Sequence, residues 1–131
     1  ASTALYADLA ENYKADSKYE PGTVLIFGGD EEVTTTQLKD DTRVAGVVSE
    51  KPGYLMNDGL KGDNVIALAL QGRVPVKVVG IVKKGDLLVS ASTRGFAISN
   101  NRAGVGTVIG KAISSKDDAG AGTVEVVVGR V

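Results

Sequence analysis

Residues 64–82 read NVIALALQGRVPVKVVGIV and carry the pattern that decides the fold. The second part, residues 73–82, alternates valine with other residues, which is the period of a β-strand with one buried face. The valines of this face are Val74, Val76 and Val78. The first part, residues 64–71, is apolar on both faces and predicts a strand that is buried on both sides. Pro75 has no N–H to donate to a sheet, so we expect it at a sheet edge or a bulge.

Seven further strands are expected on either side of this stretch. Each is a short run rich in Val, Ile, Leu or Thr between turns that contain Gly, Asp or Pro. They span residues 23–27, 33–36, 43–49, 87–90, 96–98, 106–113 and 123–128. Gly46, inside one of these runs, predicts a bulge or a close approach of two backbones. About nine short strands with frequent turns predict an all-β fold, either a compact barrel or a sandwich.

The first twenty residues differ from the rest. Residues 1–20 are expected to form an N-terminal arm, which is either extended or a short helical turn. Leu5 and Leu9 recur at helical spacing, which favours the helical turn, but no convincing cap precedes them. Residues 21–131 are expected to form a single β domain. The opening at Ala1 resembles the middle of a longer polypeptide, so we expect an excised domain.

Composition narrows the class of protein. The chain has 131 residues, with 15 Lys and Arg against 16 Asp and Glu, and these charges look scattered along it. The sequence lacks a basic stripe interleaved with aromatic residues, which is the pattern expected for nucleic-acid binding. It also lacks a dense basic cluster that would bind an anionic membrane. No apolar run approaches the roughly 20 residues that span a bilayer. We therefore expect a soluble protein that binds no nucleic acid and inserts in no membrane.

The sequence has no histidine and no cysteine. Ser-His-Asp and Cys-His catalysis are therefore excluded, and zinc would lack its preferred ligands. The acidic clusters lack the spacing of a calcium loop and fit solvated turns. We expect no metal and no cofactor. A serine with a desolvated lysine remains an open nucleophile–base pair, for example Ser49 or Ser90 with Lys77.

Asp8 and Glu11 are the candidate catalytic residues. Three positions apart, they would share a face of a helical turn, where two crowded carboxyls push their pKa values apart. One could then hold a proton as an acid while the other acts as a base on water or a peptide bond. The alternative interpretation is a pair of solvated acids on the arm.

Several stretches give the chain a resemblance to a known family. They are YADLAENY (6–13), YEPGTV (19–24), RVAGVVS (43–49), PGYLMN (52–57), ALQGRVPVKV (69–78), KGDLLV (84–89), IGKA (109–112) and VVVG (126–129). In this order they resemble C-terminal domains of bacteriophage tail-fibre and related structural proteins. A more distant similarity is to the autoproteolytic intramolecular-chaperone domains of phage neck appendages, tailspikes and endosialidases. The latter similarity implies that Asp8 and Glu11 are the acids of a self-cleavage near the Ala7–Asp8 bond.

The resemblance predicts a virion protein, a structural module at the end of a phage-type tail fibre. It implies a homotrimer that assembles with an upstream fibre segment, and a host surface receptor is a further candidate partner. A trimer would also cover apolar strand faces and sheet edges. Two alternatives stay open: a self-cleaving intramolecular chaperone, whose only enzymatic activity would be one autoproteolytic turnover, and a capsid decoration protein or β-barrel adaptor.

Overall fold

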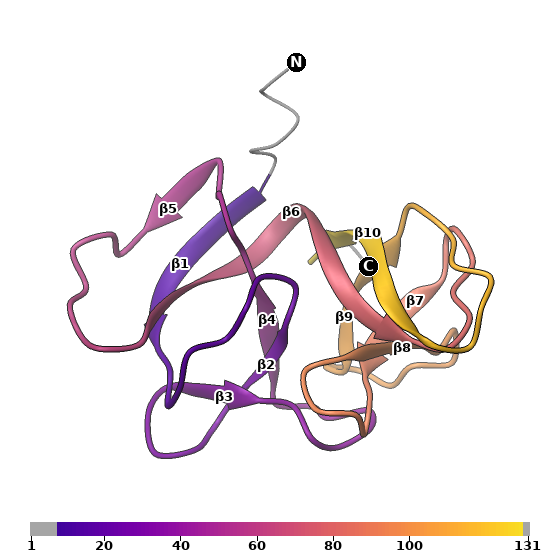
Figure 1. Ribbon diagram of the computed structural model, residues 1–131, viewed down its shortest axis with the longest axis horizontal. Helices are drawn as coiled ribbons and strands as arrows, with labels where there is room; N and C mark the ends of the chain where they lie inside the picture. The colour runs from indigo at the N-terminus through magenta and orange to yellow at the C-terminus, as the bar shows by residue number, and fades with distance from the viewer. Residues whose placement is uncertain (1–7, 130–131) are drawn as a thin grey trace.

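The computed structural model describes residues 8–129 and contains ten β-strands in this range (Figure 1). They are β1 (Asp8–Lys14), β2 (Val24–Phe27), β3 (Val33–Thr35), β4 (Val44–Val48), β5 (Tyr54–Met56), β6 (Val65–Val79), β7 (Leu87–Ser90), β8 (Ala97–Ser99), β9 (Val108–Ala112) and β10 (Ala121–Val128). The expected all-β class is confirmed. A helix able to cross a membrane is absent from residues 8–129.

Strand β6 organises the whole fold. The sequence predicts two strands here, but the structure has one continuous strand of 15 residues. Its first half pairs with β1 and β4, and its second half pairs with β10. The pairing with β1 ends at Gly72 and the pairing with β10 begins there, because Gly72 pairs with both Asp8 and Val128. This glycine has a φ of 107°. The strand continues through this glycine because new hydrogen-bonding neighbours replace the old ones.

The second half of β6 closes a barrel with β7–β10, which we call the C-terminal barrel. The strands follow each other in the order β6, β10, β9, β7, β8, and β8 returns to β6 through the parallel pair Ala97–Val78. Of the two architectures that the sequence left open, the barrel is the one observed. Gly110 in β9 lies so close to β10 that a Cβ atom there would be 2.3 Å from the carbonyl oxygen of Val127. This tight approach explains why glycine occupies the middle of strand β9.

Strands β1–β5 and the first half of β6 form the N-terminal lobe. Its sheet runs from β3 through β2 and β4 to β6 and β1, and β5 adds to β1 in parallel. A single bridge between Ala15 and Val33 connects the end of β1 to β3. Gly46 lies where the register between β2 and β4 shifts, and a Cβ atom there would be 2.5 Å from the oxygen of Ala69. The predicted bulge and close approach are both present.

Residues 8–14 of the predicted arm are a strand within this sheet rather than a helical turn. Strand β1 has β6 on one side and β5 on the other. Pairing on both edges of β1 overrides the helical spacing of Leu5 and Leu9 in the sequence, because local propensity is weak compared with tertiary context. The arm residues 1–7 lie outside the described part of the chain.

Pro75 lies on β6 where only one edge has a strand partner, β10. The N–H of Lys77, two residues later, donates to the oxygen of Gly22 in a loop at 3.0 Å. Since residues two apart on a strand point the same way, the nitrogen of Pro75 also faces this loop. The proline therefore interrupts no ladder, in agreement with the predicted local edge.

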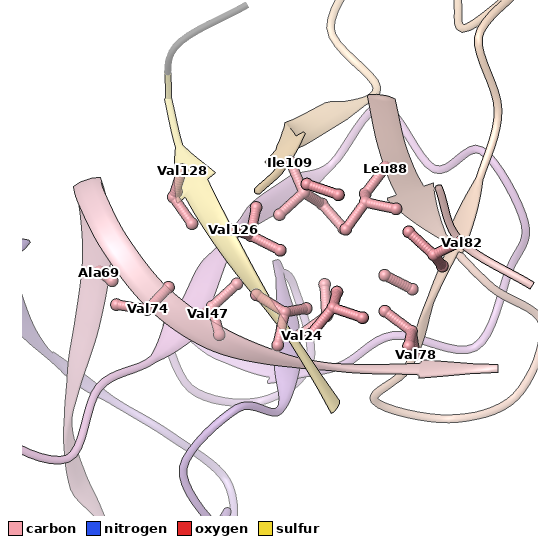
Figure 2. Packing of buried hydrophobic residues seen from close by; sticks show 14 residues of the cluster. Val24, Val47, Ala69, Val74, Val78, Val82, Leu88, Ile109, Val126 and Val128 are labelled. Atoms are coloured by element: carbon pink, nitrogen blue, oxygen red, sulfur yellow. The ribbon is translucent and has the colours of Figure 1, made fainter. Parts of the chain in front are cut away.

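Two apolar cores stabilise the molecule. The larger fills the C-terminal barrel and extends to Val24 and Val47 of the N-terminal lobe, as Figure 2 shows. The smaller core, inside the N-terminal lobe, contains Leu25, Val33 and Leu68. Burying a Val or Leu side chain contributes roughly 1.5–3 kcal/mol. Because Val24 and Val47 of the N-terminal lobe belong to the larger core, the N-terminal lobe and the C-terminal barrel share apolar packing as well as strand β6.

Candidate functional site

Asp8 begins β1 at the point where the two lobes meet. Its backbone is held by pairing with Gly72 of β6 and by the N–H of Gly53, which donates to the oxygen of Asp8 at 2.8 Å. Only 7% of the residue is exposed. A carboxyl group is rarely buried to this extent without a partner, so the surroundings of Asp8 indicate a candidate site.

A cleft of about 290 Å³ opens beside this carboxyl. Its apolar wall includes Val48, Val74, Pro21 and Pro75. Its polar lining comprises Asp8, Ser49, Glu50, Lys51, Arg73 and Glu125. These side chains come from the start of β1, the segment that follows β4, the middle of β6, and β10. The cleft thus combines one buried acid with positively charged and acidic groups at its rim.

The electrostatics of Asp8 are unusual for an aspartate. Within residues 8–129, its Oδ2 atom has no hydrogen-bond partner. Burial raises the pKa of Asp8 above its usual value, and hydrogen bonds from the Ser49 hydroxyl and the backbone oppose this only in part. The group therefore retains a proton to higher pH than an exposed aspartate does, which suits it to proton transfer in the cleft.

Glu11 does not join Asp8. Side chains of a strand alternate between its faces, so residues three apart point to opposite sides. Glu11 is half-buried, and its carboxylate accepts a hydrogen bond of 3.2 Å from the hydroxyl of Tyr13 on its own face. The helical face on which the two acids were expected to share a proton is therefore absent. Their part in self-cleavage stays a prediction, and Ala7 of the candidate bond lies outside the described residues.

The serine–lysine pairs that the sequence left open are also not formed. The ammonium of Lys77 pairs with Glu20 and lies 5.1 Å from the ring centre of Phe96. Ser90 instead donates to the oxygen of Leu38 and accepts from the N–H of Asp41, both at 2.8 Å. Its hydroxyl stabilises the loop before β4. No group of three or more acidic side chains within residues 8–129 is placed to hold a metal ion.

Sequence reasoning did not place Ser49, Lys51 or Arg73 beside Asp8, and it named Ser49 only as a candidate partner of Lys77. Ser49, Lys51 and Arg73 have no spacing that distinguishes them from other serines and basic residues. They meet because β4 and β6 pair with each other and β6 pairs with the start of β1, which brings segments distant in the sequence together. The nearest signal in the sequence was the break at Pro52 and Gly53, whose N–H holds Asp8.

Comparison with known proteins finds the fold in bacteriophages. The chain matches no family model and no curated protein. A crystal structure of pre-mature gene product 12 of bacteriophage phi29 superposes with a TM-score of 0.69 at 13% identity, over 94% of this chain and 21% of that one. The N base of head fiber gp8.5 of bacteriophage phi29 superposes with a TM-score of 0.52 at 18% identity, over 91% of this chain and 92% of that one. The chain thus spans about a fifth of gene product 12, and at these identities the likeness concerns the fold.

Proposed function

We propose that this chain is a structural module of a phage virion, part of a fibre or fibre-like appendage, and that it assembles as a homotrimer. The observation that carries the proposal is the fold shared, over more than nine-tenths of the chain, with a head-fibre base and with a part of a larger phage gene product. A domain that recurs in the base of a head fibre and within a longer gene product is suited to serve as a building block.

The architecture supports a mechanical role. Strand β6 runs through both lobes, and the larger core crosses between them. Side chains that remain exposed despite their size include Phe27, Tyr54 and Ile81. Assembly would cover such residues and the free edge of β5, which otherwise invites uncontrolled pairing.

The oligomeric state tests this function directly. Light scattering on the purified chain should give three times its mass of 13.5 kDa at micromolar concentration. Electron microscopy of virions with a gold-labelled antibody would then distinguish a tail fibre from a head fibre or a capsid decoration. A chain that remains monomeric at all accessible concentrations, and that is absent from virions, would contradict the proposal.

A second candidate, self-cleavage by an intramolecular chaperone, is favoured by one observation. Asp8 combines burial, an unpartnered Oδ2 within the described residues and a raised pKa, and it directly follows the candidate bond. Hydrolysis would add one water across the Ala7–Asp8 amide, leaving a carboxylate on Ala7 and an amine on Asp8. The carboxyl of Asp8 would move the proton between water and the departing nitrogen.

The test uses a longer chain that carries upstream fibre sequence. Intact mass should show two fragments for the natural sequence and one for Asp8→Asn. Glu11→Gln decides whether the acid on the opposite face is needed, and Asp58→Asn, an exposed aspartate, serves as control. Cleavage that persists in Asp8→Asn would refute this candidate and leave the assembly function intact.

A further inference from the structure

The two halves of the chain carry opposite charge. Residues 1–64 contain twelve Asp and Glu against six Lys and Arg, a net charge of −6. Residues 65–131 contain four acidic against nine basic residues, a net charge of +5, and together they give the −1 of the whole chain. The division falls at the start of β6, and residues 65–72 in its first half carry no charge. The acidic excess therefore lies in the N-terminal lobe and the basic excess in the C-terminal barrel (Figure 1).

The C-terminal barrel has an open apolar groove with lysines beside it. The groove has a volume of about 420 Å³ and is lined by Gly85, Ala112, Ile113 and Val127, together with Lys84 and Lys111. The residues belong to β9, β10 and the turn before β7. An apolar surface flanked by two cations fits an apolar side chain that is accompanied by carboxylates.

The N-terminal lobe presents such a combination. Phe27, the last residue of β2, is 46% exposed, and its ring meets Tyr13 edge-on with 5.6 Å between centroids. The turn that follows contains Gly28 and Gly29 and then the acidic run 30–32, all three residues of which are exposed. Glu32 is engaged, because its carboxylate accepts the N–H of Lys14 at 2.9 Å.

The carboxylates of Asp30 and Glu31 take part in no ion pair within residues 8–129. Together with Phe27 they make up a largely exposed segment, residues 27–31, which we call the Phe27 turn. It is one aromatic ring followed within four positions by two exposed acids. The Phe27 turn complements the groove, because its aromatic ring matches the apolar lining and its two carboxylates match Lys84 and Lys111.

We propose that the Phe27 turn of one copy docks into the Lys84–Lys111 groove of the next copy, in a head-to-tail contact. The inference rests on the proposed assembly function and names its interface. The turn follows β2 of the N-terminal lobe, whereas the groove is lined by residues of the C-terminal barrel, so we place the contact between chains. A contact between unlike surfaces closes into a ring when its rotation is three-fold. Contacts between like lobes are disfavoured because their net charges repel.

Charge reversal on each side tests the contact, with sedimentation velocity at low and high salt as the measurement. Lys84→Glu with Lys111→Glu should raise the concentration of half-dissociation by about tenfold or more, since like charges then face each other. Asp30→Lys with Glu31→Lys should do the same. The four substitutions combined in one chain restore opposite charges at every contact and should recover the oligomer. Lys18→Glu with Lys39→Glu, two exposed lysines outside the groove, is the matched control and should have little effect.

Circular dichroism confirms that each variant is folded. Dissociation in both double variants with recovery in the fourfold variant supports the contact. An oligomer that withstands both reversals overturns this interface but leaves the assembly function standing. A natural chain that is monomeric throughout overturns both this interface and the homotrimer of the proposed function.

Discussion

The ammonium group of Lys116 donates a hydrogen bond of 3.0 Å to the carbonyl oxygen of Gly80, 36 residues away in the sequence. It also donates to the backbone oxygens of Asp118, at 2.7 Å, and Gly120. The backbone of Lys116 pairs with Val82 in both directions, at 2.8 and 3.0 Å. A side chain that is 8% exposed thus ties the loop before β10 to the end of β6, much as a bound cation would.

Replacing Lys116 by methionine keeps the length of the side chain and removes all its donors. Three carbonyl oxygens then lose a partner in a partly dry site, and charge-assisted hydrogen bonds contribute roughly 1.5–3 kcal/mol. We expect Lys116→Met to lower the free energy of unfolding by about 3 kcal/mol in urea titrations. Lys61→Met, at an exposed lysine, is the control. An equal, small effect of both substitutions would show that the ammonium is not a structural link.

Gly110→Ala is expected to strain the C-terminal barrel. The added Cβ would be 2.3 Å from the oxygen of Val127 and 2.8 Å from the Cα of Val128, so β9 and β10 must separate. Overpacking of this kind costs roughly 1–3 kcal/mol. Gly59→Ala is the matched control because nothing lies within 4 Å of its Cβ position. The melting temperature should fall for Gly110→Ala alone, and a fall of the same size for both would contradict the close approach.

Asp8→Asn should stabilise the fold at neutral pH and have no such effect in acid. The raised pKa means that the folded state binds the proton of Asp8 more tightly than the unfolded state does. The stability of the natural chain therefore decreases as pH rises from the usual value of 3.8 through the folded pKa, and stays lower above it. Asn removes the buried charge, so we expect a gain of about 1 kcal/mol at pH 7. A loss at pH 7 in urea titrations would contradict this assignment.

Asp41 should show the opposite pH dependence. Its Oδ2 lies 2.9 Å from Nη2 of Arg43, and its Oδ1 accepts the backbone N–H of Arg43 at 2.9 Å, which lowers the pKa of Asp41. The stabilisation is present above the usual pKa of 3.8 and is lost as pH falls through the lower folded pKa.

Asp41→Asn should therefore lower stability by about 1–2 kcal/mol at pH 7, with Arg43 half-exposed and its contribution partly screened. Below the folded pKa of Asp41 the difference from the natural chain should approach zero. Asp58→Asn is again the control. A difference that does not change with pH would mean that the ion pair contributes nothing to stability.

Much of the fold was readable from local patterns. Short β-branched runs between glycine turns predicted most of the observed strands. Gly46 and Pro75 were assigned the correct kind of position because backbone geometry restricts both residue types. Strand β5 was missed because three residues in parallel with β1 carry almost no local signal.

The candidate site was predicted only in part. Asp8 lies in a cleft, but its neighbours there are Ser49, Lys51 and Arg73 rather than Glu11. The helical interpretation of residues 8–14 put two acids on one face, and the strand puts them on opposite faces. The opposite net charges of residues 1–64 and 65–131 are present in the sequence, but they nearly cancel in the net charge of the whole chain.

The sequence by itself determined that the chain is all-β, that it has no histidine or cysteine chemistry, and roughly where most strands lie. These properties depend on residue type and on alternation over a few neighbours, which require no knowledge of distant contacts. Only the tertiary structure decided that two predicted strands are one, that β1 pairs on both edges, and that Asp8 is buried beside a cleft. Each of these depends on which distant segments exchange hydrogen bonds, and that choice is made by the closure of the whole sheet.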